Sequence, residues 1–216
     1  KSEKSVSYSA GLDYQKPRFQ TGVNLFLTQI EGKIEFIDPE GGDVPEGYDF
    51  RWTNAGNATS TGIEFFLSGK LTDWAQYQAD AGYTLAKYDE KRYGDDVPGH
   101  ENSDLIPRTP AIAAGLSFDF EPVERLDITL SGDYTGKMYI EHVPEEDEDQ
   151  LIFEETDPFF LLSARVGYKL RNNIELYIIG DNLTDYTQPT RDITDAAYMY
   201  APLYGRTVRA GISLEI

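Results

Sequence analysis

The sequence predicts an all-β protein, an antiparallel sheet of about nine strands that forms the wall of a transmembrane β-barrel and is part of a larger barrel. Apolar and polar residues alternate with a period of two in segment after segment, which is typical of strands with one apolar and one polar face. Short and long connections also alternate between these segments, and aromatic residues gather beside the short ones. Transmembrane barrels have short turns at one rim and long loops at the other.

The strands begin with residues 5–14, where Val6, Tyr8 and Leu12 alternate with small and polar residues. A short connection that contains Pro17 leads into a second alternating segment, so the two are predicted to form a hairpin. Each segment is close to the 9–11 residues, roughly, that a tilted strand needs to cross a bilayer. The later alternating segments are 19–28, 61–69, 75–85, 112–120, 126–134, 160–170, 174–183 and 208–216.

The connections assign a direction to every strand. Short turns are predicted at 15–17, 71–73, 121–124 and 171–173. Long acidic or Gly- and Pro-containing loops are predicted at 37–60, 89–108, 141–157 and 186–204. The chain is therefore expected to start at the outer rim and to end at the periplasmic rim.

The two faces of the predicted strands differ in polarity. A dry sandwich core could not hold the charged face, because buried charges need partners. A soluble antiparallel sheet with one solvated face is the alternative that alternation alone leaves open. The residues predicted to face lipid are Leu12, Val23, Ile63, Leu67, Ile112, Leu116, Ile128, Leu130, Leu162, Val166, Leu176, Ile178, Ile212 and Leu214. The residues predicted to face the lumen are Asp13, Glu64, Asp80, Asp127, Asp133, Arg165, Glu175, Asp181 and Arg209. The aromatic girdle near the short turns is predicted to contain Tyr14, Phe19, Tyr77, Phe118, Phe120 and Tyr168.

Composition narrows the partners. The net charge of −19 argues against nucleic acid, which binds surfaces rich in Lys and Arg. No run of about 18 apolar residues is present, so contact with a membrane is expected through strands. The chain has no cysteine, and hence no disulfide framework holds it.

Two stretches resemble a known family. EKSVSY at 3–8 with GLDY at 11–14 resembles a strand opening in the barrels of TonB-dependent outer-membrane receptors. IELYIIGDNLTD at 174–185, followed by YGRTV at 204–208 and a last alternating strand, resembles the C-terminal part of the same barrels. The pairing of DNLTD with GRT is the most specific part, and the resemblance covers essentially the whole chain. The final Ile216 departs from the aromatic residue that usually ends such barrels.

The resemblance implies a barrel of about 22 strands with an N-terminal plug domain and a TonB box. It implies a receptor in the outer membrane of a Gram-negative bacterium that actively takes up a nutrient such as a siderophore-like metal chelate. Its expected partners are outer-membrane lipid and lipopolysaccharide, a small-molecule ligand, and the TonB complex through the N-terminal part.

Residues 1–216 are accordingly expected to be the C-terminal portion of such a barrel, without the plug domain and the remaining strands. An odd number of antiparallel strands cannot close on itself with ordinary pairing, because its two edges run parallel. A complete small barrel, with the strand number misjudged by one, is the alternative for the fold. A passive porin-like or structural barrel is the alternative for the function.

Candidate site residues lie in the predicted long loops. Nothing resembles a catalytic cluster; His142 beside Glu141 leaves only an omptin-like protease as an enzymatic alternative. Carboxylates at high density can gather Ca²⁺ or another divalent cation, although a solvated loop surface, or one bridged to lipopolysaccharide by divalent ions, is the favoured interpretation. The predicted cation ligands are His142, Glu145, Glu146, Asp147, Glu148 and Asp149. The residues predicted to contact a planar or sugar-like ligand are Trp52, Tyr93, His100, Tyr198 and Tyr200.

Overall fold

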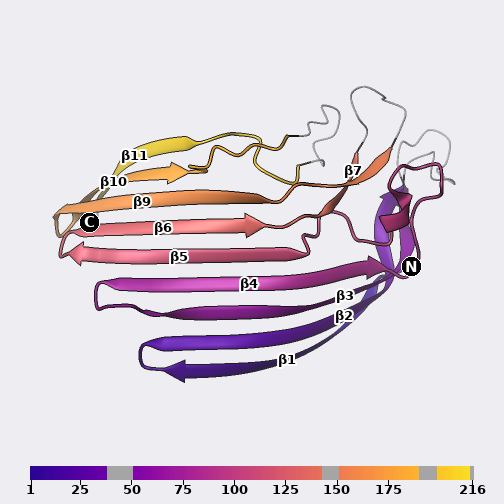
Figure 1. The fold of residues 1–216 in the computed structure, drawn as a ribbon, viewed down its shortest axis with the longest axis horizontal. Helices are drawn as coiled ribbons and strands as arrows, with labels where there is room; N and C mark the ends of the chain where they lie inside the picture. The colour runs from indigo at the N-terminus through magenta and orange to yellow at the C-terminus, as the bar shows by residue number, and fades with distance from the viewer. Residues whose placement is uncertain (38–50, 143–150, 190–198, 215–216) are drawn as a thin grey trace.

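The computed structural model describes residues 1–37, 51–142, 151–189 and 199–214, which form one large antiparallel sheet (Figure 1). The sheet has nine strands in the order β1-β2-β3-β4-β5-β6-β9-β10-β11. Its strands are β1 Lys4–Lys16, β2 Phe19–Ile37, β3 Arg51–Lys70, β4 Ala75–Tyr88, β5 Ile112–Val123, β6 Leu126–Thr135, β9 Phe159–Arg171, β10 Ile174–Asp181 and β11 Thr207–Leu214. A separate hairpin of β7 Tyr139–His142 and β8 Ile152–Glu155 lies between β6 and β9 in the chain.

The connections confirm the predicted topology. The turns that join β1 to β2, β3 to β4, β5 to β6 and β9 to β10 lie at one edge of Figure 1, and the described parts of the long connections lie at the opposite edge. The sheet among the described residues is open, with β1 and β11 at its edges. Because nine strands alternate in direction, these two edge strands run the same way. No helix in the described part of the chain is long and apolar enough to cross a membrane.

The pairing register confirms the predicted faces. One row of partners runs from Asp13 through Gly22, Phe66 and Asp80 to Gly115 and then Asp133, so these charges share a face. A row on the other face joins Leu67, Ala79 and Leu116. Each further residue of the two predicted sets falls on its expected face by the same alternation. We call these the apolar face and the polar face.

The predicted girdle lies on the apolar face beside the short turns. Tyr14 meets Phe19 edge to face with ring centroids 6.4 Å apart, and Phe118 stacks on Phe120 at 5.9 Å. The ring of Trp74, which the sequence analysis left out, lies 6.4 Å from that of Phe120. Aromatic rings at this level suit the boundary between lipid and water.

Two of the predicted long loops are partly wrong. The loop expected at 37–60 contains the first half of β3, which pairs with β2 as far as Arg51. The loop expected at 141–157 contains β8 and the end of β7, which pair with each other. The sequence does not predict these two ladders, because their residues do not alternate regularly between apolar and polar.

Except for Ala75, which lies beside a short turn, the buried apolar side chains of the described residues lie at the long-loop end. Met138, Ile140 and Phe159 form a small cluster with Tyr186 and Tyr200 packed against it. Phe153 and Ile140 are the largest fully buried side chains of the described residues. The wall itself has no second layer, so its apolar side chains are exposed among the described residues.

Candidate functional site

The long-loop end contains many polar contacts among the described residues, and they include those at a glycine bulge in β2. Gly32 in β2 has φ 63°, Gly56 in β3, which pairs with Lys33, has φ 128°, and the register shifts between Ile30 and Ile34. Positive φ values at this level favour glycine over residues with a side chain. A bulge of this kind re-aims the residues that follow it.

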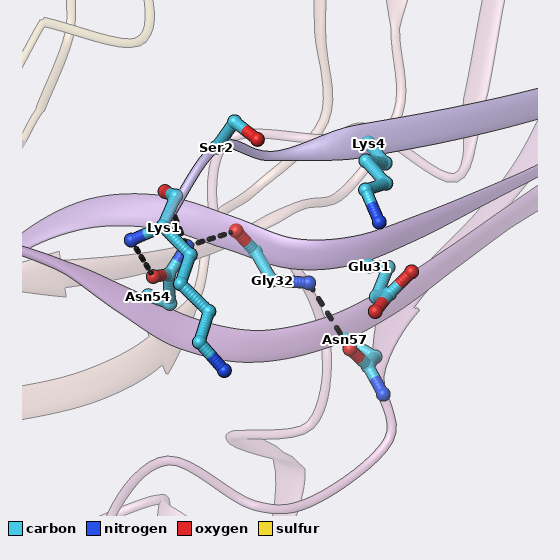
Figure 2. Close-up of a pocket in the computed structure, with 7 residues that line it drawn as sticks. All are labelled: Lys1, Ser2, Lys4, Glu31, Gly32, Asn54 and Asn57. Atoms are coloured by element: carbon cyan, nitrogen blue, oxygen red, sulfur yellow. Dashed lines mark hydrogen bonds between the residues drawn. The ribbon is translucent and has the colours of Figure 1, made fainter.

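Figure 2 shows the hollow beside this bulge, with a volume of about 620 Å³. It is lined by Lys1, Ser2, Lys4, Glu31, Gly32, Asn54 and Asn57. Asn57 Oδ1 accepts a hydrogen bond from the Gly32 N–H at 3.1 Å, and Asn54 Nδ2 donates one to the Gly32 carbonyl at 2.6 Å. These asparagine side chains hold the bulge. The register partners Lys4 and Glu31 also share the apolar face with Leu12, so the hollow opens away from the polar face.

The bulge turns Lys33 and Glu35 toward the polar face. Odd-numbered residues in the regular part of β2, such as Val23, lie on the apolar face. Glu35 nevertheless accepts hydrogen bonds from Lys33 Nζ and from the hydroxyl of Tyr88, a residue that shares the polar face with Asp80. The bulge thus places the Glu35 carboxylate beside groups that stabilise its negative charge.

Arg92 joins three segments at this point. Its guanidinium lies 3.0 Å from Glu35 Oε2 and donates to Glu141 Oε1 at 2.9 Å, and it stacks over the rings of Tyr88 and Tyr93. The hydroxyl of Tyr93 donates to the same Glu141 oxygen at 2.6 Å. We call Lys33, Glu35, Tyr88, Arg92, Tyr93 and Glu141 the Arg92 cluster.

Burial and charge act together on the Arg92 cluster. Burial raises the pKa of Glu35, but the hydrogen bonds from Lys33 and Tyr88 and the charge of Arg92 outweigh it, so the pKa of Glu35 lies below its ordinary value. Burial, with the carboxylates nearby, raises the pKa values of Tyr88 and Tyr93 well above normal. Desolvation opposes the charge of Arg92, but Glu141 and the other partners raise the pKa of its guanidinium overall. A paired carboxylate and guanidinium are therefore the stable forms here.

Residues 89–111, which connect β4 to β5, fold onto the β7–β8 hairpin. Phe153 N–H donates to Pro98 C=O at 2.9 Å, and Arg108 N–H donates to Tyr139 C=O at 2.8 Å. The ring of Phe153 stacks on that of Tyr139 at 5.1 Å. A side chain at Gly99 would collide with the Phe153 carbonyl, so only glycine fits this close approach. We call residues 89–111 with this hairpin the loop cluster.

The DNLTD motif, residues 181–185, holds the two ends of the last long connection together, and we call it the clasp. Asn182, with φ 49°, donates from Nδ2 to the carbonyls of Tyr186 at 2.7 Å and Tyr204 at 3.1 Å. Asp185 Oδ1 accepts from the Arg206 N–H at 2.8 Å, and the Arg206 backbone hydrogen bond and charge hold the pKa of Asp185 below its ordinary value. The two halves of the motif thus close the base of the connection between β10 and β11.

The polar face of the wall contains a further charge cluster near the short turns. Arg165 on β9 pairs with Asp127 on β6 and with Glu175 on β10, so one side chain links adjacent strands. The three side chains crowd above Gly167, where a Cβ would collide with them. Charges that pair across strands can remain in a wall that lipid touches only on its other face.

The structure places the predicted ligand-contact residues in different surroundings. Tyr93 joins the Arg92 cluster. His100, in the short 3₁₀ helix η1 His100–Asn102, lies with Nε2 3.0 Å from Asp95. Tyr200 packs against the Met138 cluster, where its backbone N–H donates to Gln188 at 3.0 Å. Trp52 is exposed on β3. Tyr198 lies outside the described residues.

The predicted cation site stays a prediction. His142 is buried, with Nε2 2.9 Å from Glu154 Oε1. The other predicted ligands, Glu145, Glu146, Asp147, Glu148 and Asp149, lie outside the described residues. Among the residues that the structure describes, no group of three or more His, Cys, Asp or Glu side chains is arranged to hold a metal ion. Calcium titration of the native protein and of a variant with residues 145–149 neutralised would test the expectation.

Sequence reasoning missed Arg92, Glu35 and Glu141. They are separated by dozens of positions in the chain, and each is an ordinary charged residue in its own segment. The glycines at 32 and 56 are visible in the sequence and are consistent with a bulge. The sequence does not show that this bulge turns Glu35 toward the polar face. The assembled cluster can hold loops over the end of the polar face, and its charges are already paired.

Comparison with known families supports this architecture. The sequence model of the family "TonB dependent receptor-like, beta-barrel" matches residues 1–183. No curated protein matches the sequence.

Solved structures with the same fold cover nearly all of the chain. The siderophore receptor PirA from Acinetobacter baumannii has a TM-score of 0.72 and 18% identity, over 98% of this chain and 32% of that one. The ferric yersiniabactin uptake receptor FyuA from Yersinia pestis has a TM-score of 0.71 and 17% identity, over 99% and 30%. The closed form of the ferric-catecholate import receptor Fiu from E. coli K12 has a TM-score of 0.69 and 20% identity, over 98% and 27%. The chain thus spans less than a third of the length of these receptors.

Proposed function

The chain belongs to the TonB-dependent receptor-like β-barrel family, and from this premise we propose that it is a sector of an outer-membrane receptor that actively takes up a nutrient. Members of this family lie in the outer membrane of Gram-negative bacteria, and so does this chain. A plug domain, the remaining strands and the contact with the TonB complex belong to other parts of the proposed receptor.

One observation carries the proposal, namely the division of the wall into an apolar and a polar face with all long connections at one rim. Lipid requires the apolar face, and the girdle of Tyr14, Phe19, Phe118 and Phe120 suits its boundary. The polar face bears paired charges such as Arg165 with Asp127, which suits a lumen filled by water and protein.

The proposed substrate is a metal chelate of the siderophore class. The similar structures include receptors for ferric siderophores and the copper transporter OprC, which has 17% identity and a TM-score of 0.67. The net charge of −19 would favour a cationic or metal-bearing ligand at the outer rim. Outer-membrane lipid and lipopolysaccharide are the proposed neighbours of the apolar face.

Uptake of radiolabelled iron chelates by cells that produce the full-length receptor tests the function. We expect accumulation of one chelate class that requires both the receptor and TonB. A strain without the receptor and a strain without TonB are the controls. Equal accumulation with and without TonB would contradict active uptake and favour a passive porin-like barrel.

We infer that the receptor has no catalytic role. The protease alternative needs His142 to reach a peptide, whereas this side chain is 8% exposed and lies beside Glu154. Peptidase activity that the purified receptor loses on His142→Ala substitution would overturn this inference.

A further inference from the structure

The tops of β2 and β3 project beyond the rest of the sheet. The ladder between β3 and β4 ends at the Ala58–Tyr88 pair, whereas β2 and β3 continue to pair from Lys33–Gly56 as far as Ile37–Arg51. Residues 33–37 and 51–56 therefore form a two-stranded ribbon with neither strand paired to β4, and we call it the arm. A ribbon of two strands has little stability of its own.

The base of the arm has the features of a hinge. Gly56 pairs with Lys33, the residue after Gly32; the two glycines have φ 128° and 63°, and the ladder is irregular there. Nothing lies within 4 Å of the position that a Cβ at Gly56 would take, so the backbone angle rather than lack of space favours glycine. Residues that absorb changes in φ and ψ are where rigid segments turn against each other.

Charged side chains attach the arm to the loop cluster and to the end of β4. Glu35 reaches Arg92 at 3.0 Å and Tyr88 through its other oxygen, and Lys33 Nζ lies 3.3 Å from the Tyr88 hydroxyl. The backbone bond from Asp89 N–H to Asn57 C=O, at 3.0 Å, lies below the arm at the level of the hinge.

The loop cluster is joined internally in a different way. Backbone hydrogen bonds link Phe153 to Pro98 and Arg108 to Tyr139, and the Phe153 side chain is 2% exposed. The loop cluster is consequently held by backbone bonds and buried apolar surface, while the contact between the arm and the cluster depends on the Glu35 carboxylate. Contacts of this second kind can break without unfolding either segment.

We propose that the arm is a hinged gate, which bends at Gly32 and Gly56 and is latched over the end of the polar face by Glu35 on Arg92. Breaking the latch swings the arm away from the loop cluster and widens the outer mouth of the barrel. The motion itself is independent of the substrate. Its role in admitting a ligand rests on the proposed function.

Distances between two spin labels test the latch. The chain has no cysteine, so Ile34→Cys on the arm and Lys91→Cys on the loop cluster give two defined positions, both exposed. The labels are placed in the full-length receptor, with any cysteine elsewhere replaced, in liposomes without ligand or TonB. We expect one narrow distance distribution with the native latch. Glu35→Ala should add a population at longer distance.

Glu141→Ala is the matched control. It removes the other carboxylate of Arg92 but leaves Glu35 in place, so it should leave the distribution between arm and cluster narrow. Arg92→Lys keeps the positive charge but lacks the planar guanidinium that contacts two carboxylates. Its population at longer distance should be smaller than the one that Glu35→Ala gives. Heat-dependent gel mobility checks that each variant has a folded barrel.

Two outcomes would overturn the gate. One is a Glu35→Ala distribution identical to that of the native latch in a folded barrel. The other is a Glu141→Ala distribution as broad as that of Glu35→Ala, which would show general loosening rather than release of a latch. Because neither ligand nor TonB is present, these results are distinct from a failure of TonB-dependent uptake.

Discussion

The wall and the loop cluster are built on opposite principles. In the wall, apolar side chains such as Leu12 and Ile178 are 77% and 56% exposed, and backbone ladders hold the strands in register. In the loop cluster, Ile140 and Phe153 are 1% and 2% exposed. The wall thus lacks a core of its own among the described residues, whereas the loop cluster has a small one. The loop cluster is therefore preorganised rather than loosely attached.

Charges in the two regions follow the same contrast. Arg165 in the wall pairs with carboxylates on the adjacent strands β6 and β10, so its contacts add to ladders that already exist. Arg92 pairs with Glu35 and Glu141, which belong to segments that no ladder joins to each other. The same chemistry strengthens register in one place and sets the arrangement of loops in the other.

Removing a buried ring from the loop cluster should show the difference in stability between the cluster and the wall most clearly. Phe153→Ala is expected to destabilise the cluster by about 3–5 kcal/mol, the usual cost of deleting a buried aromatic ring. Hydrogen exchange should then accelerate at residues 89–111 but not in the β4–β5 ladder. Tyr204→Ala is the control, since that side chain is 82% exposed. Loss of protection in the wall as well would mean that the two regions unfold together.

In the wall, the loss of stability should instead depend on which face the substituted side chain lies on. Leu130 lies on the apolar face in mid-strand, and its neighbour Ser131 lies on the polar face opposite Ser117. Leu130→Arg should cost about 2–4 kcal/mol in a bilayer refolding titration, and Leu67→Arg the same, because a charge then faces lipid. Ser131→Arg should be tolerated better. Equal losses for both faces would invalidate the assignment of the lipid side.

Disrupting the clasp of the last long connection should reduce stability less, and only locally. Asn182→Ala removes the hydrogen bonds to Tyr186 and Tyr204 and leaves a residue poorly suited to φ 49°. Hydrogen bonds contribute about 0.5–1.5 kcal/mol each, so a loss of roughly 1–3 kcal/mol is expected in that connection. Asn182→Gly, which tolerates the angle but lacks the side chain, separates the two causes. Proteolysis at residues 182–206 is the measurement, and unchanged cleavage in both variants would show that the motif has another role.

The sequence predicted the wall well because alternation is local and repeats along the chain. Each strand of the sheet, its face and the rim of each short turn follow from period and parity, as the row from Asp13 to Asp133 shows. The loop cluster could not be predicted in this way. Phe153 meets Pro98, and Glu35 meets Arg92, through folding of remote segments, and no period marks either pair. Tyr93 was selected as an aromatic ligand contact, but its hydroxyl is engaged by Glu141.

The last and smallest effect is expected from pH, and it concerns the arm alone. The hydrogen bonds and charges around Glu35 outweigh its burial and hold its pKa below the ordinary value of 4.5. An open arm exposes the carboxyl and lets its pKa return to that value, so the open arm binds protons more readily. The latch is therefore fully effective above pH 4.5 and weakens as pH falls through the lowered pKa of the closed arm.

Three neighbours of Glu35 do not titrate in this range. The pKa values of Tyr88, Tyr93 and Arg92 are raised, so these groups keep their protons under acid conditions. Glu141, on the far side of Arg92, is the carboxylate that must be distinguished from Glu35. Spin-label distances between residues 34 and 91 should lengthen in part on acidification of the native protein. With Glu35→Gln the distribution should no longer depend on pH, whereas with Glu141→Gln it should. If the Glu35→Gln variant keeps the full response, a group other than Glu35 controls the position of the arm.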